Sequence, residues 1–162
     1  MPRVFVSIGS NIEREANIRA AVQGLRDRYG GIVLSPVYES EAVGFAGEDF
    51  YNLVVAFDSD APVEAVAAHL RRLEEQRGRR RQGPRFGPRT LDVDLLLYGD
   101  LVREAPAPRL PREEITRYAF VLRPLADIAG AMRHPVDGRS FVTLWQELDL
   151  GEQRLKPVSL AL

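Results

Sequence analysis

The stretch that decides the fold is Thr90-Leu91-Asp92-Val93-Asp94-Leu95-Leu96-Leu97-Tyr98. Its polar start and its run of leucines are typical of a largely buried β-strand bounded by turn residues. A segment rich in arginine, glycine and proline precedes it over residues 79–89, and Gly99 follows it. We therefore predict a strand over residues 90–98, the fourth strand of the chain.

Toward the N-terminus, the spacing of apolar residues predicts three further strands and two helices. Alternation with a period of two favours strands, and a spacing of 3.6 residues that stops at glycine favours amphipathic helices. The predicted strands cover residues 4–8, 32–38 and 50–58, and the predicted helices begin at Arg14 and Pro62 and end at Gly30 and Gly78. The resulting order, β-α-β-β-α-β, is that of ferredoxin-like folds. We expect an α+β fold with a mainly antiparallel sheet, helices on one face, and a C-terminal extension that includes a turn at residues 135–138 and a short helix over residues 143–148.

Composition narrows the class of protein. With 162 residues, 45% hydrophobic and 28% charged, the chain is expected to form a single domain over residues 1–162. Of the 22 basic residues one is a lysine, Lys156, and Pro157 follows it, which excludes a P-loop. The absence of cysteine excludes disulfides and thiol nucleophiles and leads us to expect a cytoplasmic location. No apolar stretch is long enough to span a membrane, so we expect no membrane partner.

Two carboxylates, Asp92 and Asp94, lie in the fourth predicted strand. Because side chains alternate along a strand, both project from the same face. Carboxylates this close repel each other unless a cation compensates, and Mg²⁺ is typically held by one or two carboxylates together with substrate phosphates. Nearby Arg79, Arg85 and Arg89 suit phosphate oxygens. The pattern favours metal-assisted phosphoryl-type transfer, and the alternative is a surface strand whose acids pair with arginines.

Arginine is concentrated near this strand, with eight arginines between Arg71 and Arg89. Such a cluster can bind nucleotide phosphates or a nucleic-acid backbone, or it can be the solvated end of a helix. RNA-binding RRM domains share the β-α-β-β-α-β order, but they stack bases on aromatic residues of their strands. Asp92 and Asp94 occupy the corresponding strand here and would repel a phosphodiester. We therefore expect no nucleic-acid partner and keep an RNA-binding module as the less favoured alternative.

Five blocks of sequence stand in an order that is typical of one enzyme family. The blocks are Ser7-Ile8-Gly9-Ser10-Asn11, residues 38–44, Phe50-Tyr51-Asn52, residues 74–79, and residues 85–96. The most specific is the run Gly87-Pro88-Arg89, followed after two residues by Asp92 and then Asp94. In these blocks the chain resembles the 6-hydroxymethyl-7,8-dihydropterin pyrophosphokinases, and the resemblance as a whole runs from Val4 to about Leu125. The resemblance implies transfer of the diphosphate of ATP to the pterin hydroxymethyl group, with release of AMP, in folate biosynthesis.

The resemblance also implies roles for individual residues. Asp92 and Asp94 would bind two Mg²⁺ ions that bridge the triphosphate, and the implied catalytic residues are Arg79, Arg89, Asp92 and Asp94. The implied ATP-binding residues are Glu74, Arg79, Arg89 and Arg112. The implied pterin-binding residues are Ser40, Val43, Gly44, Asn52, Phe86 and Phe120, in which the two phenylalanines sandwich the ring and Asn52 bonds its polar edge. Two alternatives stay open, that Phe120 belongs to the core and that Asn52 merely begins a strand.

The chain departs from the family pattern in three places. Arg112 and Glu113 stand where a histidine and then a proline or tyrosine are usual. An arginine usually stands two or three residues before the stacking phenylalanine; here Arg117 lies three residues and Tyr118 two residues before Phe120, so this assignment depends on the register. The loop at residues 40–44 lacks the usual proline. Because the carboxylate pair is intact, we expect an active enzyme, as a monomer or weak homodimer. The alternative is a paralogue with an altered pterin substrate or weak transfer activity.

Overall fold

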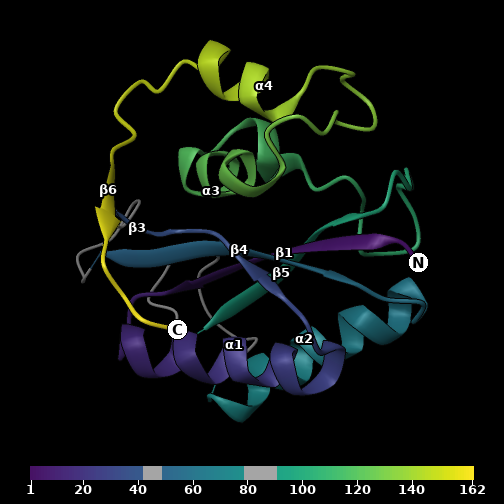
Figure 1. Ribbon diagram of the computed structural model, residues 1–162, viewed down its shortest axis with the longest axis vertical. Coiled ribbons are helices and arrows are strands. Elements are labelled where there is room, and N and C mark those ends of the chain that lie inside the picture. Colours follow the sequence, from purple (N-terminus) through teal and green to yellow (C-terminus); the bar gives the residue numbers. More distant parts are fainter. Residues whose placement is uncertain (42–48, 79–90) are drawn as a thin grey trace.

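The computed structural model describes residues 1–41, 49–78 and 91–162. These residues form one mixed sheet-and-helix body (Figure 1). Its elements in chain order are β1 (Arg3–Ser10), α1 (Arg14–Tyr29), β2 (Val33–Leu34), β3 (Val37–Ser40), β4 (Phe50–Asp58), α2 (Val63–Gln76), β5 (Asp92–Tyr98), the 3-10 helix η1 (Glu113–Thr116), α3 (Ala119–Ala129), α4 (Phe141–Glu147) and β6 (Leu155–Val158).

The sheet has the order β5-β1-β4-β3-β6, with β2 also paired to β4. Every one of these pairings is antiparallel. The first strand lies between the third and fourth strands of the predicted order, as the β-α-β-β-α-β arrangement requires when each helix crosses over a neighbouring strand. The predicted α+β, ferredoxin-like fold class is confirmed.

Two apolar cores lie on opposite faces of the sheet, because successive side chains of a strand point to alternate faces. Helices α1 and α2 cover one face, and α3 and α4 cover the other (Figure 1). We call these the α1/α2 core and the α3/α4 core. The α1/α2 core contains strand residues Val4, Val6, Ile8, Leu53, Val55, Phe57, Val93 and Leu95. The α3/α4 core contains strand residues Phe5, Val54, Ala56, Leu96 and Leu97. The helices predicted for one face are α1 and α2, and the C-terminal extension supplies the second layer.

A β-bulge interrupts the alternation of β5. Leu95 lies opposite Val6 and Leu97 opposite Phe5, so Leu96 has no partner residue on β1. Both Leu96 and Leu97 therefore belong to the α3/α4 core. The bulge separates the part of β5 that carries the two aspartates from the part that is purely apolar.

The prediction of one continuous strand over residues 32–38 is wrong. The structure has two short strands, β2 and β3, separated by Ser35 and Pro36. Pro36 has no N–H to donate to the ladder. At the break Ser35 makes two hydrogen bonds to β4, since its N–H donates to the Val54 carbonyl at 2.9 Å and its hydroxyl accepts from the Val54 N–H at 2.8 Å. After the break, β3 pairs with β4 as far as Ser40, which lies opposite Phe50, the first residue of β4.

The C-terminal extension is anchored to the sheet on both faces. Strand β6, which the sequence pattern did not predict, pairs with the outer side of β3, and Leu160 and Leu162 pack against the α1/α2 core. On the opposite face, the Tyr38 hydroxyl donates to Asp127 of α3 and accepts from Arg123 at 3.2 Å.

Among the described residues, no helix is long and apolar enough to cross a membrane.

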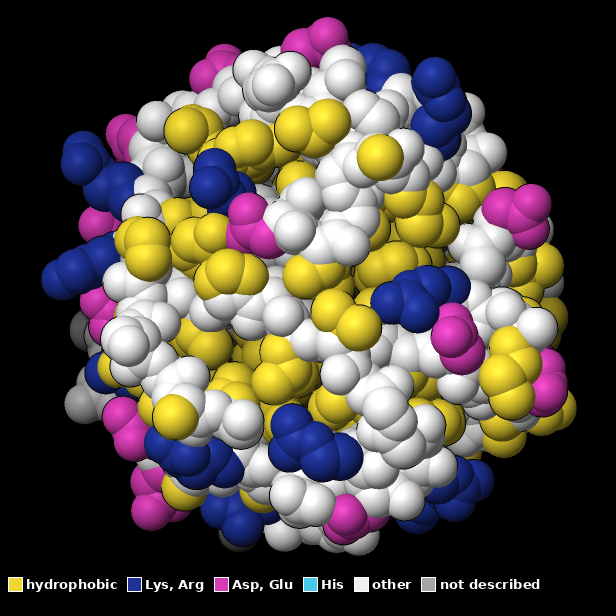
Figure 2. Space-filling model, viewed as in Figure 1, with side chains coloured by type: hydrophobic (Ala, Val, Ile, Leu, Met, Phe, Trp, Pro, Cys, Tyr) yellow, Lys and Arg dark blue, Asp and Glu magenta, His cyan; other side chains and the backbone are white. Residues whose placement is uncertain are grey.

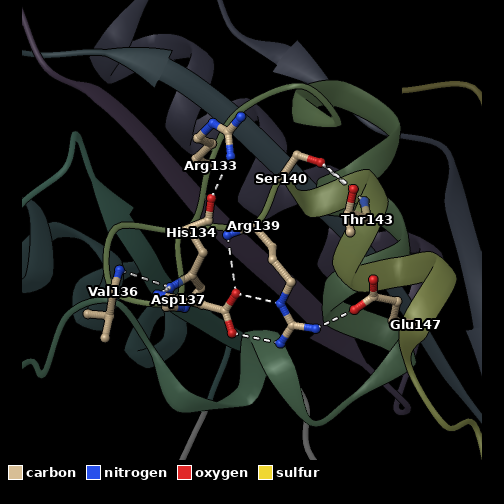
Figure 3. A network of polar contacts seen from close by, with 9 residues as sticks. Arg133, His134, Val136, Asp137, Arg139, Ser140, Thr143 and Glu147 are labelled. Atoms are coloured by element: carbon tan, nitrogen blue, oxygen red, sulfur yellow. Dashed lines mark hydrogen bonds and ion pairs between the residues drawn. The ribbon is translucent and has the colours of Figure 1, made fainter.

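The connection between α3 and α4 is a short hairpin with its own polar network (Figure 3). The His134 Nδ1 atom accepts hydrogen bonds from the N–H groups of Val136 and Asp137 at 3.1 and 3.0 Å. Arg139 donates to both oxygens of Asp137 at 2.7 and 2.8 Å and also to Glu147. The turn predicted at residues 135–138 is confirmed, because the Gly138 N–H donates to the His134 carbonyl at 2.9 Å. The network fixes the hairpin against α4, because Arg139 joins Asp137 of the turn to Glu147 of the helix.

Candidate active site

The candidate site lies where the ends of four strands meet on the α3/α4 face of the sheet. Val93 and Leu95 point into the α1/α2 core, so Asp92 and Asp94 point to the opposite face. The register places Asp92 opposite Gly9 on one side of β1, and Asn52 opposite the same glycine on the other side. The carboxylate pair and Asn52 therefore lie on one face, with β1 between them.

Asp92 and Asp94 are both partly buried. Residues two apart on a strand are roughly 6.6 Å apart along its axis, so both carboxylates can reach one ligand. Carboxylate oxygens are the donors that Mg²⁺ prefers, and Mg²⁺ needs only one or two of them beside substrate phosphates. In the described part of the chain no group of three or more His, Cys, Asp or Glu side chains is placed to hold a metal. The pair fits a magnesium ion that arrives with a nucleotide, and it does not form an all-protein metal cage.

Arg112, at the N-terminus of η1, lies against the carboxylate pair. Its Nη2 atom is 3.6 Å from Asp94 Oδ1, and its Nε atom donates to Glu114. Its backbone N–H donates to the Leu96 carbonyl of β5 at 3.0 Å, which fixes η1 along this outer strand. Burial lowers the pKa of Arg112, but the charges of Asp94 and Glu114 outweigh it, so the pKa lies above its usual value. A guanidinium therefore stands beside the predicted metal ligands.

Asn52 and Ser40 form a buried polar pair on the far side of β1. The Asn52 Nδ2 atom donates to the Ser40 hydroxyl at 2.7 Å, and Asn52 is 5% exposed. A Cβ atom added at Gly9 would lie 3.0 Å from Asn52 Oδ1, so any larger residue here would press on the Asn52 amide. The hydrogen bond sets the orientation of the Asn52 amide, and Asn52 is the third residue of β4, not its first.

Glu74 stands behind β5, near the end of α2. Its Oε2 atom accepts a hydrogen bond from the Val93 N–H at 2.9 Å, and the side chain is buried. This contact ties the end of α2 to the aspartate-bearing part of β5. Glu74 thus contacts the backbone of Val93, the residue between Asp92 and Asp94, and belongs to the β5 side of the candidate site.

Phe120 lies in the first turn of α3. It is partly buried, packs against the α3/α4 core, and stacks on Tyr118 with ring centroids 5.1 Å apart. It is therefore a peripheral core residue with part of its surface exposed. Five predicted site residues lie outside the described residues, namely Val43, Gly44, Arg79, Phe86 and Arg89.

The family model for 7,8-dihydro-6-hydroxymethylpterin-pyrophosphokinase (HPPK) matches residues 5–130. The chain belongs to this family. As a member of the HPPK family it is an ATP-dependent diphosphotransferase, and the family's reaction is pyrophosphoryl transfer to hydroxymethyldihydropterin in folate synthesis. The matched region contains β2 to β5 and all of β1 but its first two residues, together with the carboxylate pair, Asn52, Arg112 and Phe120.

Relatives and solved structures agree with this assignment. A 2-amino-4-hydroxy-6-hydroxymethyldihydropteridine pyrophosphokinase of Pseudomonas aeruginosa is 39% identical over 145 residues, covering 85% of this chain and 86% of the relative. The enzyme of the same name from Aquifex aeolicus is 29% identical over 138 residues, covering 84% and 86%. A crystal structure of Plasmodium falciparum HPPK-DHPS has a TM-score of 0.65 at 15% identity, over 91% of this chain and 43% of that one. The chain thus spans less than half of that larger protein, and the likeness to it shows the fold.

Two features of the site escaped the sequence-based prediction. The contact between Arg112 and Asp94 joins residues that are separated by a proline-rich connection, and no local pattern indicates it. The sequence pattern assigns Gly9 no role beyond its place in the block Ser7-Ile8-Gly9-Ser10-Asn11. A glycine near the end of a strand is nevertheless a signal that another part of the chain approaches the backbone closely. Its role emerges once the register places it between Asn52 and Asp92.

Proposed function

We propose that the α3/α4 face of the sheet, at the ends of β1, β3, β4 and β5, is where the HPPK reaction takes place on this chain. In this reaction the hydroxymethyl oxygen of the pterin forms a bond to the β-phosphorus of ATP and releases its proton to solvent. The bond from that phosphorus to the α–β bridging oxygen breaks, and AMP leaves. The observation that carries the proposal is the common face: Asp92 and Asp94 lie on one side of Gly9, and the Asn52–Ser40 pair lies on the other.

The nucleotide end of the site is assigned to the carboxylate pair. Asp92 and Asp94 would hold Mg²⁺, as two ions in the arrangement that the family resemblance implies. Bound there, Mg²⁺ would neutralise charge on the triphosphate oxygens. Arg112 supplies a further positive charge, because its guanidinium already lies 3.6 Å from Asp94 and is held by Glu114. Arg79 and Arg89 are proposed to bind phosphates in the same region, and Glu74 supports the strand from behind.

The pterin end of the site is assigned to Asn52 and its surroundings. The Asn52 amide is pre-oriented by Ser40, so its carbonyl and remaining N–H can meet the alternating donors and acceptors of a pterin edge without reorganisation. We assign Phe120 and Phe86 to stacking on the ring, and Val43 and Gly44 to the wall of the pocket. None of these groups is a nucleophile or a general base, which suits a transfer that depends on positioning and electrostatics.

A paralogue with weak transfer or an altered pterin substrate is the second candidate. The observation that favours it is the pairing of Arg112 with Asp94, since a guanidinium at a predicted metal ligand competes with the metal for that carboxylate. RNA binding has less support. In Figure 2, basic and acidic side chains of the described residues are interspersed on the visible face and form no continuous basic surface there.

The deciding experiment measures AMP release by purified protein supplied with ATP, Mg²⁺ and 6-hydroxymethyl-7,8-dihydropterin. We expect AMP release that depends on the pterin, and we expect Asp92→Asn and Asp94→Asn each to abolish it with little change in melting temperature. Asp58→Asn is the matched control, because Asp58 lies at the end of β4 in an exposed pair with Arg3. If wild-type protein releases no AMP in response to the pterin, this function is wrong. Full activity in either β5 variant would contradict the metal assignment.

Three broader predictions accompany this function. We propose that residues 1–162 form one domain, which is supported by the single sheet that both apolar cores share. We propose small-molecule partners only, ATP and the pterin, acting on a monomer or weak homodimer. The cytoplasmic location expected from a chain without cysteine stays a prediction.

A further inference from the structure

Arg14, the first residue of α1, bridges the two strands that lead into and out of residues 42–48. Its Nη1 atom is 2.9 Å from Glu39 Oε2 on β3 and donates to the Asp49 carbonyl, just before β4, at 3.0 Å. Its guanidinium carbon lies 3.9 Å from the centroid of the Tyr51 ring on β4. The Arg14 side chain is only 22% exposed, so these contacts are partly shielded from water. One cation thus holds the end of one strand and the start of the next.

These contacts lie directly behind the pterin end of the proposed site. Glu39 and Tyr51 are opposite each other in the β3–β4 register. Because strand residues alternate, their neighbours Ser40 and Asn52 face the other side of the sheet. That side carries the hydrogen bond between Asn52 Nδ2 and the Ser40 hydroxyl, at 2.7 Å. Arg14 and the Asn52–Ser40 pair therefore connect the same two strands from opposite faces.

The geometry of the guanidinium explains why an arginine is needed. A planar cation can lie over an aromatic ring and at the same time donate in its own plane to a carboxylate and a carbonyl. A lysine can satisfy the carboxylate as a point charge, but it cannot reproduce the planar stack. If β3 slides or separates from β4, at least one of the three contacts breaks. Arg14 thus resists the displacement that would lengthen the Ser40–Asn52 hydrogen bond.

We propose that Arg14 is a positioning residue for the pterin: it fixes β3 against β4 and thereby fixes the Asn52 amide in its binding orientation. This inference rests on the proposed function, and it extends the site to a residue on the opposite face of the sheet that touches neither substrate. Loss of Arg14 should weaken pterin binding and leave the nucleotide end, on β5 and η1, unchanged.

The test compares Arg14→Gln, Arg14→Lys and wild-type protein in the AMP-release assay and in direct titration with the pterin. For Arg14→Gln we expect the pterin KM and Kd to rise about 5- to 30-fold. This is less than the roughly 10- to 150-fold that loss of a direct charge-assisted hydrogen bond would cause, because Arg14 acts on the pterin only through β3 and β4. The KM for ATP should stay within about twofold of the wild-type value, because the ATP contacts lie elsewhere. Arg14→Lys should recover part of the loss. The control is Arg19→Gln, on the same helix, where the exposed side chain donates to the Ala161 carbonyl.

The outcomes separate this inference from the function on which it rests. Wild-type activity with an unchanged pterin KM in Arg14→Gln overturns the positioning role alone. Equal increases in the KM values for pterin and ATP, or a loss shared by Arg19→Gln, indicate a general structural effect and overturn it as well. If Arg14→Gln does not fold, Glu39→Gln removes the same ion pair while leaving a hydrogen-bond acceptor, and a smaller rise confined to the pterin KM is expected. An inactive wild-type protein refutes the function itself.

Discussion

Replacement of Arg112 by glutamine should tighten the binding of a divalent cation to the protein in the absence of nucleotide. The guanidinium of Arg112 lies 3.6 Å from Asp94 Oδ1, so it competes with a metal ion for that carboxylate. Glutamine keeps a polar side chain, two bonds shorter than that of arginine, and removes the positive charge. The same change should weaken ATP binding, because the protein loses a charge that we propose to meet the phosphate oxygens.

The magnitude follows from the distance and the exposure of the pair. At 3.6 Å, two unit charges interact by about 4.6 kcal/mol for an effective dielectric constant of 20 and by about 1.2 kcal/mol in bulk water. Arg112 and Asp94 are 33% and 35% exposed, so the lower part of this range applies. Glu114 shares the same guanidinium and reduces the effect further. We expect a change of about 1–2 kcal/mol, which is about 5- to 30-fold in the Kd of the metal.

The assay is calorimetric titration of the nucleotide-free protein with Mn²⁺, which serves as a probe for the proposed Mg²⁺ site. Arg109→Gln is the matched control, because it removes the same charge from a neighbouring, more exposed arginine that pairs with Glu113 at 2.7 Å. We expect Arg109→Gln to bind Mn²⁺ like wild-type protein. Unchanged or weaker Mn²⁺ binding by Arg112→Gln would refute the view that Arg112 acts as a counter-ion of the carboxylate pair.

Three further predictions concern pterin binding, stability and pH. Asn52→Ala should raise the pterin KM by about tenfold and leave the ATP KM unchanged in steady-state assays, because one oriented hydrogen-bonding group is lost. Glu74→Ala should lower the free energy of unfolding by about 1–3 kcal/mol in urea titrations, since the buried Val93 N–H loses its acceptor, and Glu74→Gln should cost less. Burial lowers the pKa of His134 from 6.5, so its stabilising contribution is complete above that value and is lost as the pH falls toward the folded-state pKa. His134→Asn, which can still accept from the turn, should therefore show a smaller drop in melting temperature between pH 7.5 and 5.5 than wild-type protein.

Most of the sheet could be predicted from periodicity, because each central strand has at least one buried face. The strand at residues 50–58 and the helix at residues 14–29 are observed with the predicted bounds. The break at Ser35 and Pro36 was missed because residues on both sides are apolar, and the alternation pattern responds weakly to a single proline. Strand β6 was missed because Lys156 and Pro157 are poor strand residues, which an outer strand with one free edge tolerates.

The sequence predicted several individual residues of the candidate site but not the contacts that join distant segments there. The alternation of side chains along a strand predicted that Asp92 and Asp94 share one face. The structure shows which face it is, namely the one opposite α1 and α2. The contact of Arg112 with Asp94 depends on how η1 packs along β5, and the bridge made by Arg14 depends on the pairing of β3 with β4. Both are tertiary contacts between distant segments, for which a single sequence contains no local signal.

The bulge at Leu96 determines where β5 can change in length during evolution. One extra residue between Asp94 and Leu95 would turn both carboxylates toward the α1/α2 core, where two buried charges have no solvent. Loss of Leu96, which has no partner on β1, would leave the pairs on either side in register. Insertions and deletions in this strand should therefore be tolerated best at Leu96, and the segment from Asp92 to Leu95 should keep a constant length even where its sequence drifts.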